Sequence, residues 1–354
     1  MTTKEYIAES VKLLKEMVRI PSPSFSEDVV CTHISKWMNE RGIAHERIGN
    51  NIVAEHVTDT DKPTLMLCAH IDTVSPCEGY RFDPYDPEAG GEGVITGLGS
   101  NDDGASAVAM IAAYRYLKSS NVTLVLSCEE ERSGKGGMTG LWSKRLNRID
   151  YAIVGEPTGM KAATSERGLL VIDATAHGTS GHAARNEGEN ALYIALEDIE
   201  KIRKHVFTRK SPLMGEVNVN VTQINAGSAH NVIPDRCDFV IDIRPTEQYT
   251  NEDILNELQS ICRSELKPRN LANRSSATHT DSPLLKAAKE LGIETFTSPT
   301  TSDWMRISCD AIKMGPGDSA RSHRKDEFVT VKEIEDGVKT YIDFIGNLYE
   351  HIME

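Results

Sequence analysis

The residues best suited to chemistry in this chain are histidines and carboxylates that follow short apolar segments. His70 and Asp72 come directly after the apolar segment Thr64–Ala69. Their His-x-Asp spacing places both side chains on one face of an extended chain. A carboxylate in that position can support an imidazole that binds a metal ion. Taken alone, however, a histidine at a strand end is more often structural than a ligand.

Three further apolar segments lead into residues of the same kinds. Thr123–Ser127 precedes three consecutive glutamates, Tyr151–Gly155 precedes Glu156, and Ala311–Met314 precedes a Gly-Pro-Gly turn and His323. Each has an ordinary alternative, since consecutive glutamates can begin a solvated helix and a glutamate before proline can lie in a turn. Together they indicate one cleft, because ligands of open parallel sheets bind outside the carboxyl ends of the strands.

Asp102 belongs to the same group, because it stands just before the Ala-rich stretch Ala105–Leu117, which predicts a helix. As an isolated residue it could cap that helix. Two histidines and three carboxylates at one cleft match the nitrogen and oxygen donors that zinc prefers. They suffice for two ions that share a carboxylate. The seven cysteines form no C-x-x-C pair, so we expect no cysteine zinc site.

The elements that must position these residues are strands and helices of an α/β domain. The short apolar segments are typical of strands buried on both faces of a parallel sheet. Apolar residues at helical spacing predict a helix that ends before Pro21 and a second helix over Ser26–Arg41, with Gly42 beyond its end. We therefore predict an α/β layered domain with a mostly parallel sheet.

The pattern changes in the middle of the chain. Apolar and polar residues alternate in Leu169–Ala176, Val217–Ile224 and Asp238–Ile243, which is typical of strands with one solvated face. Amphipathic helices are predicted over Asn190–Val206 and Asn251–Glu265. The order strand, helix, strand, strand, helix is that of a split βαβ, ferredoxin-like sandwich.

After this segment the α/β pattern returns, with a helix predicted over Pro283–Leu291 and a further buried strand. We therefore predict a discontinuous catalytic domain of residues 1–166 and 277–354. A smaller α+β domain of residues 167–276 is inserted into it.

Composition excludes several classes of function. The chain has 354 residues, 39 Lys and Arg against 53 Asp and Glu, and a net charge of −14, so we expect no nucleic acid partner. No apolar run approaches the ~18 residues of a membrane span, and Lys4 and Glu5 lie where a signal peptide needs an apolar core. An odd number of dispersed cysteines is typical of free thiols in a reducing compartment. A cytoplasmic location is expected.

Taken together, these motifs resemble those of the acetylornithine deacetylase and succinyl-diaminopimelate desuccinylase family of dinuclear zinc amidohydrolases, relatives of aminoacylase and the glutamate carboxypeptidases. Leu98, Glu129 and Asp103-Gly104 depart from the usual family pattern, but none of these departures removes a ligand. The matching motifs occur in the family's order over almost the whole chain: His70-x-Asp72, Gly97-x-Gly99-x-x-Asp102, Glu129-Glu130-Glu131, Gly155-Glu156-Pro157-Thr158, Gly181-His182, Asn231-Val232-Ile233-Pro234 with Arg244 following, and Gly315-Pro316-Gly317 before His323.

The resemblance implies a centre of two zinc ions per chain, for which cobalt or manganese could substitute. One ion is expected at His70, Asp102 and Glu156. The second is expected at Glu131, His323 and the same Asp102, which bridges the two ions.

The resemblance also implies roles for residues that bind no metal. Glu130 is the expected general base, and Asp72 is expected to orient or polarise the neighbouring histidine. His182, Asn231 and Arg244 of the inserted domain are expected to contact the substrate carboxylate or the oxyanion. The guanidinium of Arg244 suits a carboxylate because it can bind bidentately. A surface salt bridge for Arg244 and a structural role for His182 remain alternatives.

The predicted protein is a homodimeric zinc hydrolase that removes the acyl group from an N-acylated amino acid, with the dimer formed through the inserted domain. N-acetylornithine, or an N-acyl citrulline or lysine, is the favoured substrate, within arginine biosynthesis. Arg306 falls one position later than in the desuccinylases, which disfavours that assignment and leaves the role of Arg306 open. A dipeptidase or carboxypeptidase is the alternative enzyme. A non-catalytic binding protein is the remote one, because Glu130 and every ligand are present.

Overall fold

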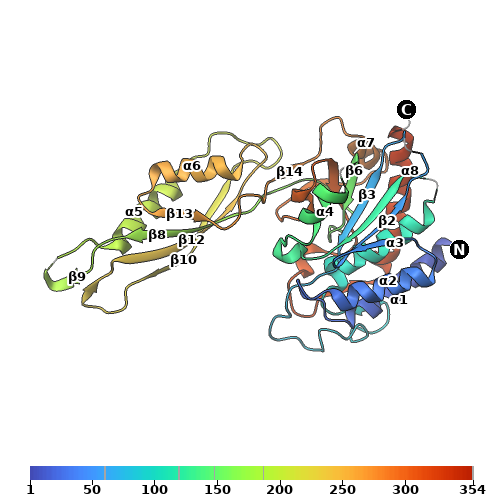
Figure 1. Ribbon diagram of the computed structural model, residues 1–354, viewed down its shortest axis with the longest axis horizontal. Helices are drawn as coiled ribbons and strands as arrows, with labels where there is room; N and C mark the ends of the chain where they lie inside the picture. The colour runs from blue at the N-terminus through green and yellow to red at the C-terminus, as the bar shows by residue number, and fades with distance from the viewer. Residues whose placement is uncertain (60, 119, 147, 186, 353–354) are drawn as a thin grey trace. The chain divides into compact units, whose positions relative to one another are not determined.

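The computed structural model describes residues 1–59, 61–118, 120–146, 148–185 and 187–352. The chain divides into two compact units (Figure 1). Unit 1 comprises Met1–Thr164, Ala277–Phe296 and Ser302–Glu354, and unit 2 comprises Ser165–Ser276 and Thr297–Thr301. The predicted boundary after residue 166 lies two residues after the first unit boundary, and the one after residue 276 coincides with the second. Thr297–Thr301, predicted within the catalytic domain, belongs to unit 2 instead.

Unit 1 is built around a sheet whose central strands are parallel. These neighbours run in one direction: β5 (Val122–Ser127), β3 (Leu65–His70), β6 (Tyr151–Val154) and β16 (Asp310–Lys313). On either side lie the antiparallel strands β2 (Asn51–His56), beside β5, and β7 (Ala162–Glu166), beside β16. The edges are completed by β1 (Glu46–Ile48), β14 (Ser276–Ala277) and β15 (Thr295–Ser298).

Helices cover both faces of this sheet (Figure 1). Along β3, Leu65, Leu67 and Ala69 belong to one apolar core, whereas Met66 and Cys68 belong to another. Because successive side chains of a strand point to opposite faces, the two cores lie on opposite sides of the sheet. The larger core includes α1 (Thr3–Val18), α2 (Asp28–Glu40), α3 (Ala105–Tyr116), α7 (Pro283–Glu290) and α8 (Val331–Ile352); the smaller includes α4 (Met138–Arg145) and the helical turn Asp303–Arg306. This is the predicted α/β layered fold.

Unit 2 is an antiparallel sheet with two helices on one face (Figure 1). The sheet order is β10-β12-β8-β13, and α5 and α6 share one apolar core with β8 and β12. The elements follow the chain as β8 (Leu170–His177), α5 (Ala191–Lys204), β10 (Asn218–Ala226), β12 (Arg236–Arg244), α6 (Asn251–Ile261) and β13 (Glu265–Pro268).

The helix predicted over Asn251–Glu265 is too long. The structure ends α6 at Ile261, and Glu265 begins β13 instead. The reason is local, because the backbone N–H groups of Arg263 and Ser264 donate to the buried carboxylate of Asp198 on α5. They are therefore not available to continue the helix.

Short strand pairs place the remaining candidate residues. In unit 1, β17 (Phe328–Thr330) pairs with β4 (Val94–Thr96) shortly after His323. In unit 2, β11 (Val232–Ile233) pairs with β9 (Gly181–His182). In the part of the chain that the structure describes, no helix has the length and apolar character needed to cross a bilayer.

Candidate metal centre and active site

The predicted metal-binding residues of unit 1 come from neighbouring strand ends. His70 is the last residue of β3 and pairs with Ser127, the last residue of β5. Glu130 and Glu131 follow β5, and Glu156 follows β6. His323 follows β16, and Asp102 precedes α3. The parallel register of the central strands therefore brings side chains from distant parts of the chain to one edge of the sheet.

Asp102 lies between the two histidines. Its Oδ1 is 3.1 Å from Nε2 of His70, and its Oδ2 is 3.7 Å from Nε2 of His323. Nε2 of His323 also lies 2.9 Å from the carboxylate of Glu131. Each oxygen of Asp102 thus faces a different imidazole, which is the arrangement that a carboxylate bridging two ions requires.

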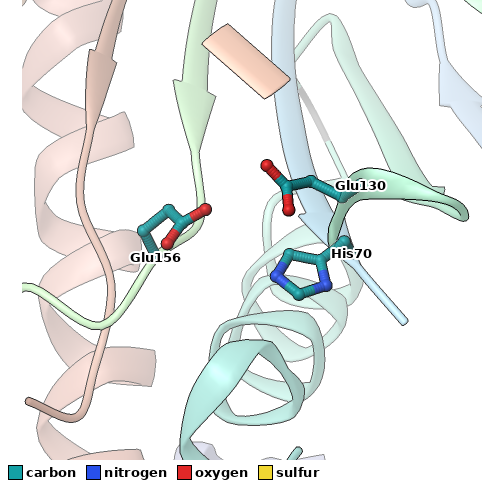
Figure 2. Close-up of side chains that lie close together, drawn as sticks. All are labelled: His70, Glu130 and Glu156. Atoms are coloured by element: carbon teal, nitrogen blue, oxygen red, sulfur yellow. The ribbon is translucent and has the colours of Figure 1, made fainter. Parts of the chain in front are cut away.

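Glu130 and Glu156 turn their carboxylates toward the imidazole of His70 (Figure 2). One ligand atom from each of these three residues lies within 4.8 Å of the others, and the same holds for His70, Asp102 and Glu131. Each group is compact enough to hold one metal ion. Glu130, the predicted general base, therefore lies close enough to His70 and Glu156 to share a metal ion with them.

The charge balance of the site fits divalent cations. Burial raises the pKa of Glu130 well above its ordinary value, and it does the same to Glu156. Nearby carboxylates add to both shifts, since Glu156 acts on Glu130 and Asp102 acts on Glu156. Buried negative charge of this density is costly unless it is paired. The nitrogen and oxygen donors match those of zinc, so the residues present fit the implied metal.

His70 presents one fixed nitrogen to the site. Its Nδ1 lies 2.9 Å from the backbone carbonyl of Asp72, which can only accept a hydrogen bond. Nδ1 therefore carries the proton, and Nε2 is the nitrogen left to face Asp102 or a metal ion. Burial opposes charge on His70, but hydrogen bonds with Asp102 and Asp72 outweigh it and raise its pKa well above the usual range.

The carboxylate of Asp72 orders the glutamate triplet. Its oxygens accept the backbone N–H groups of Glu130 at 3.0 Å and Glu131 at 3.1 Å. The hydroxyl of Ser24 donates to the same carboxylate at 2.7 Å. Asp72 therefore contacts the triplet through its carboxylate, and it contacts His70 through its carbonyl and, at 3.5 Å from Nδ1, through the same carboxylate. No motif marks Ser24, which lies 48 residues before its partner.

A further buried acid lies behind the site. Asp303 accepts a hydrogen bond of 2.6 Å from the hydroxyl of Ser127, and burial raises its pKa to about 6. Its charge contributes to the raised pKa of Glu130. Asp303 is not among the residues predicted from the sequence, because nothing in the residue pattern marks a buried acid in a helical turn.

The predicted substrate residues of unit 2 are not all brought together. His182 and Asn231 are adjacent, because β9 pairs with β11 and the N–H of Ala183 donates to the carbonyl of Asn231. Both residues are exposed. Arg244 ends β12, and a strand from Arg236 to Arg244 spans about 27 Å at the usual rise per residue. His182 and Arg244 therefore lie at opposite ends of the unit.

The guanidinium of Arg244 contacts a carboxylate of its own strand. Its Nε and Nη2 donate to Asp242 at 2.8 and 3.2 Å. The salt bridge that the sequence left as an alternative is thus present. Both side chains are about one-third exposed, so water weakens the pair.

Comparison with known proteins assigns the family. The model of peptidase family M20/M25/M40 matches residues 66–347, which include every predicted metal ligand. The chain belongs to this family. The predicted resemblance and fold class are confirmed, and the M20 chain is a hydrolytic enzyme, as expected.

Relatives of the M20 chain align along most of their length. It is 25% identical to the succinyl-diaminopimelate desuccinylase of Wolbachia pipientis subsp. Culex pipiens (strain wPip), over 96% of this chain and 94% of the relative. It is 26% identical to the acetylornithine deacetylase of Proteus mirabilis (strain HI4320), over 92% and 93%. The fold is similar to that of a Bacillus subtilis dinuclear metal binding peptidase of the M20 family, with a TM-score of 0.72, 15% identity and coverage of 97% and 99%.

Proposed function

We propose that this M20 enzyme is a metal-dependent deacylase of N-acylated amino acids. The favoured substrate is N-acetylornithine or a close analogue, N-acyl citrulline or N-acyl lysine, within arginine biosynthesis in the cytoplasm. The observation that carries the proposal is the position of Asp102 between His70 and His323, with Glu131 and Glu156 beside them. Relatives named as acetylornithine deacetylase and succinyl-diaminopimelate desuccinylase support an N-acyl amino acid as the substrate class.

The proposed centre holds two zinc ions, with cobalt or manganese as substitutes. His70, Asp102 and Glu156 would hold one ion, and Asp102, Glu131 and His323 the other. When bound, such ions polarise a carbonyl oxygen and lower the pKa of water towards ~7.

Glu130 is proposed as the general base. It takes a proton from the attacking water and passes it to the leaving amine, a contribution of roughly 10²–10⁴-fold. Asp72 keeps the carboxylate aimed, since it binds the backbone N–H of Glu130 at 3.0 Å.

Substrate contacts are proposed for unit 2. His182 and Asn231 would stabilise the oxyanion, and Arg244 would exchange its Asp242 partner for the substrate carboxylate. We propose that a homodimer forms through this unit. Its strand β10 is an exposed sheet edge, and Tyr193 and Leu196 of α5 are 63% and 49% exposed.

The alternative within the family is a dipeptidase or carboxypeptidase. Such an enzyme uses the same metal centre and base and differs in the leaving amine. A non-catalytic binding protein is disfavoured, because Glu130 and the ligand residues are all present and lie close together.

The test is a substrate screen with metal-replete protein. The panel contains N-acetyl and N-succinyl forms of ornithine, citrulline and lysine, together with small dipeptides, and products are identified by mass spectrometry. We expect an N-acyl amino acid to be hydrolysed with kcat/KM at least about tenfold above any dipeptide, a difference of ~1.4 kcal/mol in activation free energy. A preference for dipeptides would contradict the deacylase assignment.

Metal dependence is tested on the same preparation. Chelation should abolish hydrolysis, and added zinc or cobalt should restore it. The variant Glu130→Gln is the control, because it should remain inactive after the metal is restored. Full activity in rigorously metal-free protein would exclude the metal centre.

A further inference from the structure

The loops that carry Asp102 and His323 are joined by a buried contact outside the proposed catalytic groups. Glu327 follows His323 in the second loop and is only 2% exposed. Its Oε1 accepts the backbone N–H groups of Asn101 and Asp102, each at 2.9 Å. Its backbone carbonyl accepts the N–H of Gly97 at 2.9 Å. The second loop therefore binds the main chain of the first loop, directly at the proposed metal ligand Asp102.

Asn101 makes the reverse connection. It is fully buried, and its side-chain amide bonds both backbone groups of Asp318 in the second loop. Its Oδ1 accepts the N–H of Asp318 at 2.9 Å, and its Nδ2 donates to the carbonyl of Asp318 at 3.1 Å. Each loop thus contributes one side chain that bonds the main chain of the other.

Close approach of the two loops depends on a glycine. A Cβ atom on Gly317 would lie 2.4 Å from Oδ1 of Asn101, and the φ of this glycine is +90°. In the sequence motif Gly315-Pro316-Gly317, which precedes His323, the last position therefore requires a glycine. It lets the Asn101 amide reach the backbone of Asp318.

We propose that Glu327 and Asn101 are positioning residues that set the metal affinity of the site shared by Asp102 and His323. The inference rests on the proposed metal centre. Asp102 and Glu327 lie 225 residues apart in the chain, so these contacts fix two ligands that the sequence does not hold near each other. Residues that orient ligands typically change metal affinity by 10–100-fold when they are replaced.

The experiment titrates cobalt into metal-free protein and follows binding by calorimetry and by visible absorption. Glu327→Ala removes the acceptor and leaves two buried N–H groups unpaired. We expect it to bind the ion shared by Asp102 and His323 10–100-fold more weakly, and the other ion, which keeps His70 and Glu156, less so. Glu327→Gln keeps an oxygen at the same position and should stay within about threefold of wild type.

Asn101→Ala should weaken the same ion. Because both residues serve one connection, the double variant Asn101→Ala/Glu327→Ala should be little weaker than either single variant. Glu335→Ala, which removes an exposed carboxylate of α8 that pairs with Lys339, is the matched control and should leave both affinities unchanged.

The outcomes separate three possibilities. If the metal-free Glu327→Ala protein loses thermal stability and weakens both ions equally, the residue is merely structural and the inference is wrong. If the wild type binds two ions and Glu327→Ala does the same with equal affinity, the inference alone is overturned. If the wild type binds no ion, the proposed metal centre fails and the inference falls with it.

Discussion

Glu130 and Glu131 are adjacent in the chain, but their carboxylates have different neighbours. The carboxylate of Glu131 lies 2.9 Å from Nε2 of His323, whereas Glu130 groups with His70 and Glu156. Burial raises the pKa of Glu130 well above its ordinary value. Both glutamates group with His70, but only Glu131 also contacts His323, which suits the proposed ligand role of Glu131 and the proposed base role of Glu130.

The difference predicts two distinct failures. Glu130→Gln should keep metal and substrate binding, while kcat falls by roughly 10²-fold or more because the proton acceptor is lost. Glu131→Gln should lose affinity for one ion, and excess metal should partly rescue its activity. Metal analysis by mass spectrometry, together with kcat and KM for each variant, provides the measurement. Loss of metal in Glu130→Gln and retention of metal in Glu131→Gln would exchange the proposed roles of base and ligand.

The cluster of candidate residues in unit 1 could be predicted from the sequence, but the residues that hold the cluster in place could not. His70 and Asp72 can be recognised by their His-x-Asp spacing at the end of an apolar segment. Ser24 donates to the side chain of Asp72, 48 residues away, and Glu327 accepts from the backbone of Asp102, 225 residues away. No local sequence pattern indicates either contact. A single serine or glutamate carries no signal of such a partner.

At the scale of elements, buried strands were the most predictable feature. The apolar segment predicted at Tyr151–Gly155 contains β6, Tyr151–Val154, because a strand covered on both faces needs an unbroken apolar run. The strand β13 is not predicted, because it is mostly exposed, has no apolar run and follows the end of α6 closely. The acceptor that ends α6 is Asp198, on a helix more than sixty residues earlier.

The lowered pKa of Asp198 makes the stability of unit 2 depend on pH. It accepts hydrogen bonds from the N–H of Arg263 and from both the N–H and the hydroxyl of Ser264. Burial tends to raise its pKa, but the hydrogen bonds from Ser264, Lys201 and Arg263 together outweigh burial and hold the pKa below its ordinary value. A depressed folded-state pKa stabilises the fold above the unfolded pKa of ~3.9 and loses that effect as the pH falls below it.

We therefore expect Asp198→Asn to destabilise unit 2 by about 1–3 kcal/mol at pH 7, and the difference from wild type to shrink below about pH 4. Hydrogen exchange of α5 in metal-free protein measures the effect. Glu200→Gln, which removes an exposed partner of Arg203 on the same helix, should leave exchange unchanged. A difference for Asp198→Asn that grows in acid would contradict the assigned pKa shift.

At the scale of the whole molecule, His182 and Arg244 lie at opposite ends of unit 2. One substrate molecule of ordinary amino acid size cannot contact both ends of a strand about 27 Å long. The proposed homodimer resolves this, because a closed two-fold assembly lets each chain lend His182 to its partner and receive one in return.

Subunit exchange tests that arrangement. The variants Glu130→Ala and His182→Ala should each be inactive alone. In a mixed dimer the His182→Ala chain keeps its own Glu130 and receives His182 from its partner, so one site of two works. Equal mixing should restore roughly a quarter of wild-type activity, because half of the dimers are mixed. Mixed dimers verified by mass spectrometry that show no activity would place His182 in its own chain's site.

The position of β16 determines the order in which the molecule can form during synthesis. This strand lies between β6 and β7 in the sheet, yet it is made after the whole segment Ser165–Ser276. Until residue 313 leaves the ribosome, the nascent chain holds β6 with an open edge, the kind of edge that promotes aggregation. The segment between them can fold in the meantime. His323 emerges later still, so the proposed metal site can be completed only after every strand of the central sheet has been synthesised.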